Sequence, residues 1–448
     1  MRPIPSLPNH HIVQAAGTIP IILAALLTAY LPAGCSKDDS SNPAGPDDQA
    51  SEYGCIAGHA PLFDDYSLYW GDLHSHTVYS DDAATQEPPP GTPADALAYA
   101  ADPAGGNLDF VAITDHAETL TAEEWSAYLD TVRTASSSPA LVVFPGFEYT
   151  NSSYQAGHGH KCVLLKDPEH VPATPSGANS RSDPLALWED LDGSPGTGYY
   201  MTVPHHPAKG IDYGVNMSTD WDAAYVDGER QPLVEIYSVH GCSEVAGCEE
   251  PVEHFHDDRT VETALLQWLE TGDEAYKLGI IASTDSHKST PGAVAEVEEN
   301  VAEMEGPYTG GLAAVWAAAL DREALWDGLS ERRTLGTTGA RIAVEFTAKA
   351  GSTIVPMGGT LSISDPTDVY LHVSASGEAG VGIHQIDIIR NGALLVSAQT
   401  GHLDYRDPGV SADTYYRVKV YQNETPVVHW NHCHYERAWT SPIWIERE

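Results

Sequence analysis

Two histidines lie one residue apart in the stretch YWGDLHSHTVYSDD, which covers residues 69–82. His74 and His76 are preceded by an aspartate and followed by the acidic pair Asp81 and Asp82. Neutral imidazole and carboxylate groups together bind Zn²⁺, Mn²⁺ or Fe²⁺. A polar surface loop is the alternative interpretation, because short clusters of His and Asp also arise by chance. The stretch indicates a metal site if further ligands occur elsewhere in the chain.

Further imidazoles and carboxylates occur where short apolar runs end. In chain order they are His116 after DFVAIT, Glu148 after LVVFPGF, His205 and His206 after YYMTVP, and Asp285 and His287 after GIIAST; His160 stands just ahead of the run KCVLL. A single histidine at a strand end is more often a hydrogen-bonded structural residue than a ligand. Gathered on one face, however, such groups would repel one another or stay unsatisfied without a cation. The joint pattern therefore predicts a metal centre.

Short apolar runs alternate with helical segments from residue 69 to about residue 338. The runs are rich in β-branched and aromatic residues and have strand length. Three helices between them have clear start signals: Thr92 before Pro93, the pair Thr121 and Glu124, and Asp183 before Pro184. This alternation favours a parallel sheet or barrel, in which functional residues lie at the ends of strands.

The pattern changes after about residue 340. Segments such as ARIAVEFTAKA and TYYRVKVYQ alternate apolar with polar residues, and RNGALL contains an Asn-Gly hairpin turn. We expect a small all-β, sandwich-like domain over residues 341–448, after an α/β domain over residues 61–340.

The chain is strongly acidic. Its 448 residues include 64 Asp and Glu but only 22 Lys and Arg, a formal net charge of −42. Nucleic acid is not an expected partner, because phosphate backbones are bound by clustered Lys and Arg. A small anionic substrate bound at a metal centre remains compatible with this charge, since a divalent cation dominates the field at close range.

The N-terminus predicts export. An apolar run over residues 19–31 is short for a membrane span and typical of a signal peptide. Ala33 and Gly34 before Cys35 resemble the lipobox of bacterial lipoproteins, which implies a signal peptide over residues 1–35, lipidation of Cys35 and a flexible tether over residues 36–60. The protein would then contact a membrane only through this anchor, in the outer membrane or periplasm. An ordinary secretory signal is the alternative.

Five cysteines follow Cys35. In an exported protein, Cys242 and Cys248 could close a small disulfide loop, whereas Cys55, Cys162 and Cys433 leave an odd number. The sequence does not assign the pairing.

Four motifs together resemble those of the PHP (polymerase and histidinol phosphatase) superfamily. They are DLHSHTVYSD, ITDH, the glutamate of GFEYT, and STDSH. TPADALAYA and REALWDGLSERRTLGTTGARI are similar to a secreted branch of that superfamily, and YERAWTSPIWI to metallohydrolases related to carbaryl hydrolase. The resemblance implies a distorted (β/α)7 barrel that binds two or three divalent metal ions, with Zn, Mn or Fe as candidates.

The resemblance also implies a ligand for each ion. The first ion would be bound by His74, His76 and Asp285. Glu148 would bridge to a second ion held by His160 and by either His205 or His206. Asp81, His116 and His287 would form the third, catalytic cluster, with Asp82 a second candidate at the position of Asp81. Asp72 and Asp115 would orient ligands, because ligating imidazoles donate their other N–H group to a carboxylate.

This chemistry predicts a hydrolase. Divalent cations acidify a water molecule, which attacks phosphorus or a carbonyl carbon. We expect a phosphoesterase acting on a small molecule; a carbamate, ester or amide hydrolase and a non-catalytic surface metal-binding module are the alternatives. Lys209 and Lys288 lie near the predicted ligands and are candidates for binding a substrate anion. The metal identity, the substrate and the oligomeric state are left open.

Overall fold

The structure is a computed structural model that describes most of the chain after residue 62. The described residues are 63, 65–86, 88–136, 140–150, 158–175, 183–212, 215–294, 308–423 and 435–448. The predicted signal peptide with Cys35 and the predicted tether lie outside them, as do Cys55 and Cys433. Within these ranges, no helix combines the length and the apolar character needed to cross a membrane.

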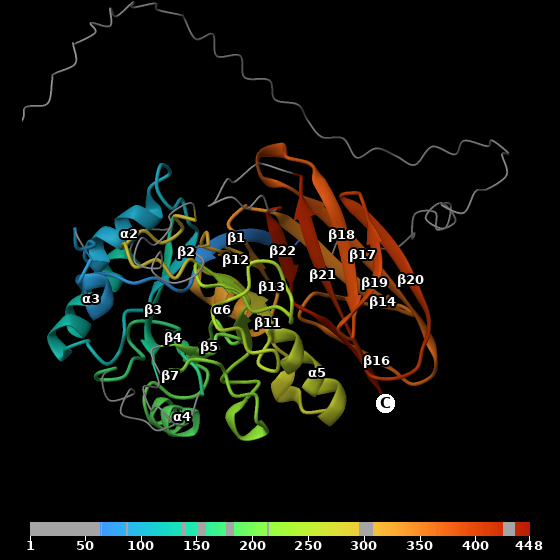
Figure 1. The fold of residues 1–448 in the computed structure, drawn as a ribbon, viewed down its shortest axis with the longest axis horizontal. Coiled ribbons are helices and arrows are strands. Elements are labelled where there is room, and N and C mark those ends of the chain that lie inside the picture. Colours follow the sequence, from blue (N-terminus) through green and yellow to red (C-terminus); the bar gives the residue numbers. More distant parts are fainter. Residues whose placement is uncertain are drawn as a thin grey trace, which may run out of the picture. The chain divides into compact units, whose positions relative to one another are not determined.

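A large mixed sheet positions the ends of the strands that carry the predicted ligands (Figure 1). Its first part contains, in spatial order, β13 (Thr334–Thr337), β12 (Leu312–Ala317), β1 (Ser67–Asp72), β2 (Phe110–Ile113), β3 (Val142–Tyr149), β4 (Lys161–Leu165) and β5 (Tyr200–Pro204). β1, β2 and β3 pair in parallel. The carboxyl ends of these three strands therefore lie at one edge, where the first ligands follow them.

The mixed α/β character is as expected, but the distorted (β/α)7 barrel is not evident. β12 pairs antiparallel with both β1 and β13, and β4 pairs antiparallel with both β3 and β5. The parallel pair β8 (Leu233–Glu235) and β11 (Gly279–Ile281) contacts β5 and β13 but shares no hydrogen-bonded ladder with them, so the sheet is not closed. Strand–helix alternation in a sequence specifies the order of elements, whereas the direction of each strand depends on tertiary packing.

The helices begin at the capping residues expected from the sequence. In α2 (Pro93–Ala101) and α3 (Ala122–Ala135), the side chains of Thr92 and Thr121 accept hydrogen bonds from the third helical N–H group in a complete capping box. In α4 (Pro184–Gly193), Asp183 accepts from the Ala186 N–H group. Among the described residues, the other α-helices are α1 (Asp81–Ala84), α5 (Val261–Thr271) and α6 (Arg322–Ser330).

The region after residue 340 is built from strands and a single described 3₁₀ turn, coloured orange to red in Figure 1. One sheet has the order β15 (Thr353–Pro356), β14 (Ala343–Ala350), β17 (Thr367–Ser376) and β20 (His402–Val410). The remaining strands are β16 (Thr360–Ile363), β18 (Ile383–Arg390), β19 (Ala393–Ala398), β21 (Thr414–Gln422), β22 (Arg437–Thr440) and β23 (Ile443–Arg447). The expected hairpin turn at Asn391 and Gly392 joins β18 to β19, and both residues have the positive φ that this turn requires.

The large sheet continues across the expected domain boundary. β22 pairs with β13 on one side and with β21 on the other, and the described residues from residue 63 onward belong to one compact unit. The division into separate domains at residue 340 therefore stays a prediction.

Alternating side chains of the central strands enter two different hydrophobic clusters. Phe110 and Ala112 of β2 lie in the cluster that also contains Leu233 of β8, whereas Val111 and Ile113 pack in the cluster that faces α2 and α3. Such burial on both faces explains why these strands read as continuous apolar runs. The strands are thereby fixed on both sides, and so are the loops at their ends.

The described cysteines are free thiols. Cys242 and Cys248, the suggested pair, are not joined by a disulfide; the Cys248 thiol donates a hydrogen bond to the Cys242 carbonyl oxygen at 3.4 Å. Cys162 is buried under the predicted ligands in β4.

Gly336 allows β13 to approach β11 closely without a ladder. A Cβ atom at this position would lie 2.6 Å from the carbonyl carbon of Ile281. We expect Gly336→Ala to lower the free energy of unfolding by about 1–3 kcal/mol, the usual cost of overpacking. Denaturant unfolding measures this cost, and Gly193→Ala is the control, because a Cβ atom at Gly193 meets nothing within 4 Å. Equal stability of the two variants would contradict the close packing of β11 and β13.

Candidate metal centre

The loop after β1 carries His74 and His76, and two buried aspartates hold its backbone. Asp72 accepts hydrogen bonds from the backbone N–H groups of His74, Thr284 and Gly292. Asp115 accepts from the Thr77 N–H group at 2.6 Å and from its hydroxyl at 2.7 Å. Both carboxylates thus fix the loop backbone, rather than binding the imidazole rings as expected.

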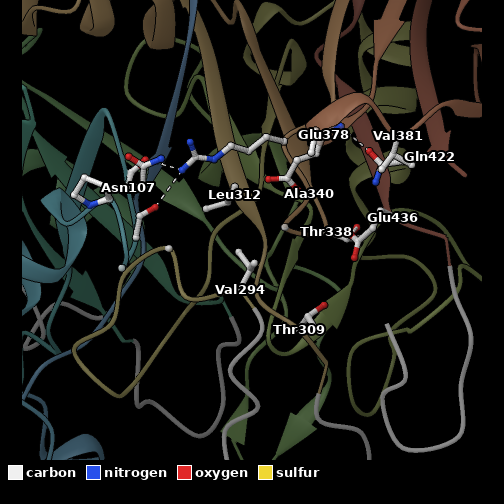
Figure 2. Close-up of a pocket in the computed structure, with 17 residues that line it drawn as sticks. Asn107, Val294, Thr309, Leu312, Thr338, Ala340, Glu378, Val381, Gln422 and Glu436 are labelled. Carbon is white, nitrogen blue, oxygen red and sulfur yellow. Dashed lines mark hydrogen bonds between the residues drawn. The ribbon is translucent and has the colours of Figure 1, made fainter. Parts of the chain in front are cut away.

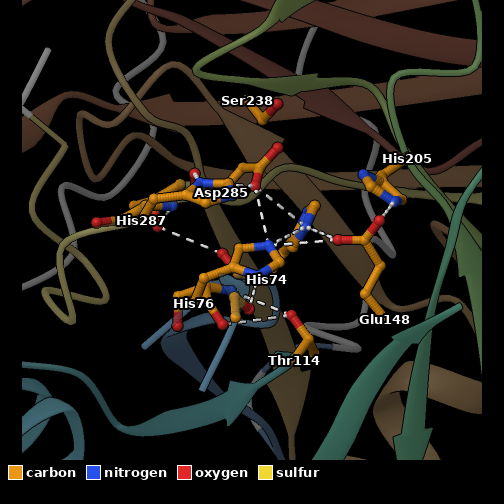
Figure 3. Close-up of polar contacts among 12 residues, drawn as sticks. His74, His76, Thr114, Glu148, His205, Ser238, Asp285 and His287 are labelled. Carbon is orange, nitrogen blue, oxygen red and sulfur yellow. Dashed lines mark hydrogen bonds and ion pairs between the residues drawn. The ribbon is translucent and has the colours of Figure 1, made fainter. Parts of the chain in front are cut away.

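The first group of donors consists of His74, His76, Glu148 and Asp285, which face one point (Figure 3). The two Nε2 atoms lie 3.2 Å apart. The distances from these nitrogens to Glu148 Oε2 and Asp285 Oδ1 are 3.2 to 3.5 Å. Asp285 has a φ of 57°, the left-handed region, and its N–H group donates to the His74 carbonyl oxygen.

These separations fit a bound cation. Ligand atoms about 2.0 Å from a tetrahedral Zn²⁺ lie about 3.3 Å from one another. The five distances among the four side chains scatter closely around that value. Two neutral imidazoles would not otherwise point both Nε2 atoms at each other and at two carboxylates.

The second group of donors surrounds the other oxygen of Glu148. His160 Nδ1 lies 2.9 Å and His205 Nε2 3.4 Å from Glu148 Oε1. His206 packs beside His205, with ring centroids 4.3 Å apart. His160 Nε2, both ring nitrogens of His205 and His206 Nδ1 are buried without a hydrogen-bond partner. Such buried orphan nitrogens suit ligands of a cation, because leaving them unpaired is costly.

Both histidines of PHHP join the second donor group, because the backbone turns between them. Side chains of consecutive strand residues point to opposite faces. His206 follows the end of β5 and has a φ of 35°, so its ring lies on the same side as that of His205, within 5.2 Å of the His160 ring.

The third group of donors contains Asp82, His116 and His287. Asp82 Oδ2 lies 3.2 Å from His116 Nε2 and 3.0 Å from His287 Nε2. The carboxylate of Asp81 instead accepts a hydrogen bond from the Asp82 N–H group and is exposed. The one-turn helix α1 begins at Asp81 and directs its second residue, not its first, toward the two imidazoles.

Each ligating nitrogen of the first and third groups is directed by a contact at the opposite ring nitrogen. The Nδ1 atoms of His74 and His76 lie 3.1 Å from Glu235 Oε2 and 2.9 Å from Ser80 Oγ. His287 Nδ1 lies 3.1 Å from the Asp285 carbonyl oxygen. With Nδ1 protonated, each ring donates to its oxygen and presents a lone pair on Nε2, the tautomer that a metal ion requires.

Burial and the surrounding charges oppose each other at the carboxylates. Burial raises the pKa of Glu148, but His116, His205 and His160 outweigh it and hold the pKa well below its usual range. Burial likewise opposes ionisation of Asp285, and His74 and His240 lower its pKa well below normal. Burial lowers the pKa of His205 to about 3. The carboxylates therefore stay ionised and His205 stays neutral. Burial opposes charge on His74 and His116, but Asp285 and Glu148 outweigh it and hold the pKa of these two rings above normal, so a binding cation would displace a proton from each.

A buried lysine lies beside the first group. Lys209 Nζ is 3.2 Å from His240 Nδ1 and 3.4 Å from Glu253 Oε2, and His240 Nε2 is 3.2 Å from Asp285 Oδ2. His240 thus connects Lys209 to a predicted metal ligand. Lys288, the other predicted anion-binding residue, is partly exposed.

A pocket of about 530 Å³ is lined by other residues (Figure 2). Asn107, Thr338, Glu378 and Glu436 contribute to its lining, and none of the predicted metal ligands does. It lies next to Gly292, whose N–H group is bound by Asp72. The candidate centre is therefore defined by its donor atoms and not by this cavity.

Sequence reasoning missed several residues that support the centre. Glu235 is the last residue of β8 and is buried, and a buried acid at a strand end is a signal of pairing that could have identified it. Ser80 and Thr150 gave no such signal, because hydroxyl residues are common in loops; Thr150 Oγ1 lies 3.1 Å from His116 Nδ1. Cys162 lies in the donor cluster with His74 and His205, and burial raises the pKa of its thiol to about 12.

The fold and the site define an α/β protein with a histidine-rich candidate metal centre at the strand ends. Residues 64–123, 118–266 and 294–390 match the family described as "Protein of unknown function (DUF3604)". The chain belongs to this family.

Relatives and solved structures extend the comparison. Uncharacterized proteins of Chlamydia trachomatis and Chlamydia muridarum are each 24% identical to this chain, over 395 and 401 residues. Each alignment covers 85% of this chain and 57% of the relative, so the chain spans little more than half the length of these relatives.

One solved structure is a two-domain protein from Bacteroides vulgatus that contains a predicted PHP-like metal-dependent phosphoesterase. It is 12% identical and has a TM-score of 0.40, with 80% of this chain and 91% of that chain covered. A likeness this weak supports no conclusion about the present protein.

Glu235 tests the assignment of the supporting contacts. Glu235→Gln keeps the side-chain size but removes the charge that binds the His74 Nδ1–H group, and we expect cation affinity to fall by about 10–100-fold. Glu229→Gln, an exposed change outside the centre, should leave affinity unchanged. Competition with a chelator of known affinity measures both variants, and unchanged affinity in Glu235→Gln would contradict the orienting role.

Proposed function

We propose that this protein is a metal-dependent hydrolase of the PHP type, acting on phosphoesters. The observation that carries the proposal is the spacing of the first donor group, in which two imidazole nitrogens and two carboxylate oxygens converge at 3.2 to 3.5 Å. The buried orphan nitrogens of His160, His205 and His206 add a second place for a cation.

Three cations have candidate ligands. His74, His76, Glu148 and Asp285 would hold the first. Glu148, His160 and His205, with His206 beside them, would hold the second, and Asp82, His116 and His287 the third. Imidazole with carboxylate suits Zn²⁺, Mn²⁺ and Fe²⁺ alike, so the donor set selects a class of metal and not one ion.

Bound divalent cations would supply an acidified water as the nucleophile and would stabilise the charge that develops on oxygen. The three donor groups differ in how far their side chains are exposed to solvent. The side chains of His116 and His287 are 13% and 15% exposed, whereas those of His74 and His76 are fully buried. A substrate entering from solvent would therefore reach the third donor group first.

A phosphoester is the favoured substrate class on electrostatic grounds. The net charge of −42 repels anions, so an anionic substrate requires local positive charge. Several cations bound at neighbouring donor groups would provide this positive charge. Lys209 adds a buried ammonium group near Asp285. The substrate would be a small molecule, and nucleic acid remains an unexpected partner.

Two alternatives follow from the same residues. A carbamate, ester or amide hydrolase, as in the predicted likeness to carbaryl hydrolase, would use the same cations on a carbonyl carbon. A non-catalytic metal-binding module would bind the cations and hydrolyse neither substrate class.

Glu148→Gln tests the centre. Because Glu148 places one oxygen in each of two donor groups, we expect the variant to lose both cations together and turnover to fall on the order of 10³-fold. Glu118→Gln is the matched control, since Glu118 is exposed and lies 3.9 Å from His116 Nδ1 at the rim. Elemental analysis and turnover of an aryl phosphate are measured on the same samples. Full metal content with near-normal turnover in Glu148→Gln would reject the proposed centre.

The same assay with an aryl carbamate and an aryl ester separates the alternatives. Preference for the phosphate supports the phosphoesterase, preference for the carbamate or ester supports the rival hydrolase, and metal binding without any turnover supports the non-catalytic module.

We further propose that the protein is exported and anchored to the cell envelope through a lipid on Cys35, with an ordinary secretory signal as the alternative. Residues 19–35 support this proposal through their sequence alone. Cys35→Ala should convert a detergent-partitioning protein into an unprocessed or released one. An unlipidated mature protein cleaved at another position would refute the anchor.

A further inference from the structure

A second cluster of metal-ligand side chains lies on the outer face of the sheet formed by β15, β14, β17 and β20. Asp404 of β20 is the direct cross-strand partner of His372 of β17, and His402 stands two residues before Asp404. The intervening Leu403 points to the buried face, as do Leu371 and Val373 on β17. The pleat therefore places both imidazoles and the carboxylate on one side of the sheet.

Their donor atoms converge. His372 Nδ1 lies 2.8 Å from Asp404 Oδ1, and His402 Nε2 lies 3.1 Å from Asp404 Oδ2. The two rings meet edge to face, with centroids 4.9 Å apart. One ligand atom from each of the three residues lies within 4.8 Å of the others.

We propose that His372, His402 and Asp404 form a surface site for a borderline divalent transition-metal cation such as Zn²⁺. Two imidazoles with one carboxylate match the donor preference of such ions, whereas Ca²⁺ and Mg²⁺ prefer oxygen ligands alone. The side chains are 20%, 57% and 21% exposed, so the remaining coordination positions open to water.

The site would tie an edge strand to its neighbour. β20 ends the strand order of this sheet, and the cation would link its first residues to the middle of β17. A cation that binds only this folded pairing stabilises it. His402 and Asp404 lie beyond residue 390, the last residue matched to the family, so the site does not depend on the proposed hydrolase.

Equilibrium dialysis of the full chain against Zn²⁺, followed by elemental analysis, tests the proposal. We expect His372→Ala and His402→Ala each to bind one Zn²⁺ fewer per chain than the wild type. His170→Ala is the matched control, because His170 forms a surface pair with Asp167 at 2.9 Å that contains one imidazole instead of two. This variant should bind as much Zn²⁺ as the wild type does. Equal Zn²⁺ content in all four proteins would overturn the site and show an ordinary His–Asp hydrogen-bond network.

Repeating the dialysis in Glu148→Gln separates this site from the candidate centre. The loss of one Zn²⁺ on changing His402 should persist in that background, whether or not the centre binds metal, and His402→Ala alone should leave hydrolysis unchanged. If either alanine variant fails to fold, diethylpyrocarbonate modification of the wild type decides. Zn²⁺ should protect His372 and His402 but not His170, and equal modification with and without Zn²⁺ would overturn the proposal.

Discussion

The negative charge buried at the strand ends is the constraint on which this structure depends. Glu148 and Asp285 are almost completely buried, and both stay ionised because imidazoles surround them. Buried carboxylates are costly unless positive charge compensates them. Protons on the histidines can provide that charge, but then the rings cannot ligate. A cation would satisfy carboxylates and neutral imidazoles together, and the separations between the donor atoms are those that a cation needs.

The rest of the fold positions these groups. Parallel pairing of β1, β2 and β3 brings the loop of His74 and His76 close to His116 and Glu148, and the β8–β11 pair brings Glu235 and Asp285 from far along the chain. Asp72 and Asp115 hold the loop backbone, while Glu235 and Ser80 direct the rings. Loss of the contacts to the loop backbone or of the contacts to the rings would leave the ligand residues unchanged but would misdirect their donor atoms.

Much of the candidate site could be predicted because it follows a local rule, that ligands stand where apolar strands end. His74, His76, Glu148, His205 and Asp285 obey the rule, and the structure brings them together. Asp82 could not be separated from Asp81, since the choice depends on the direction of a one-turn helix. Glu235 stands at a strand end, but its partner His74 lies far away along the chain, and Ser80 is a loop hydroxyl that the sequence does not distinguish from others. Strand direction and closure of the sheet also depend on packing between distant segments, which is why the α/β class could be predicted while the distorted (β/α)7 barrel is not evident in the structure.

The central claim is that one carboxylate, Glu148, joins two cation sites. Anomalous diffraction from crystals of the metal-loaded chain, recorded at the absorption edge of the bound metal, tests it most directly. The account predicts one peak among His74, His76 and Asp285 and another beside His160 and His205, about 3.5–4 Å apart, with Glu148 between them. The absence of either peak in a crystal whose protein carries metal, or two such peaks without Glu148 between them, would contradict it.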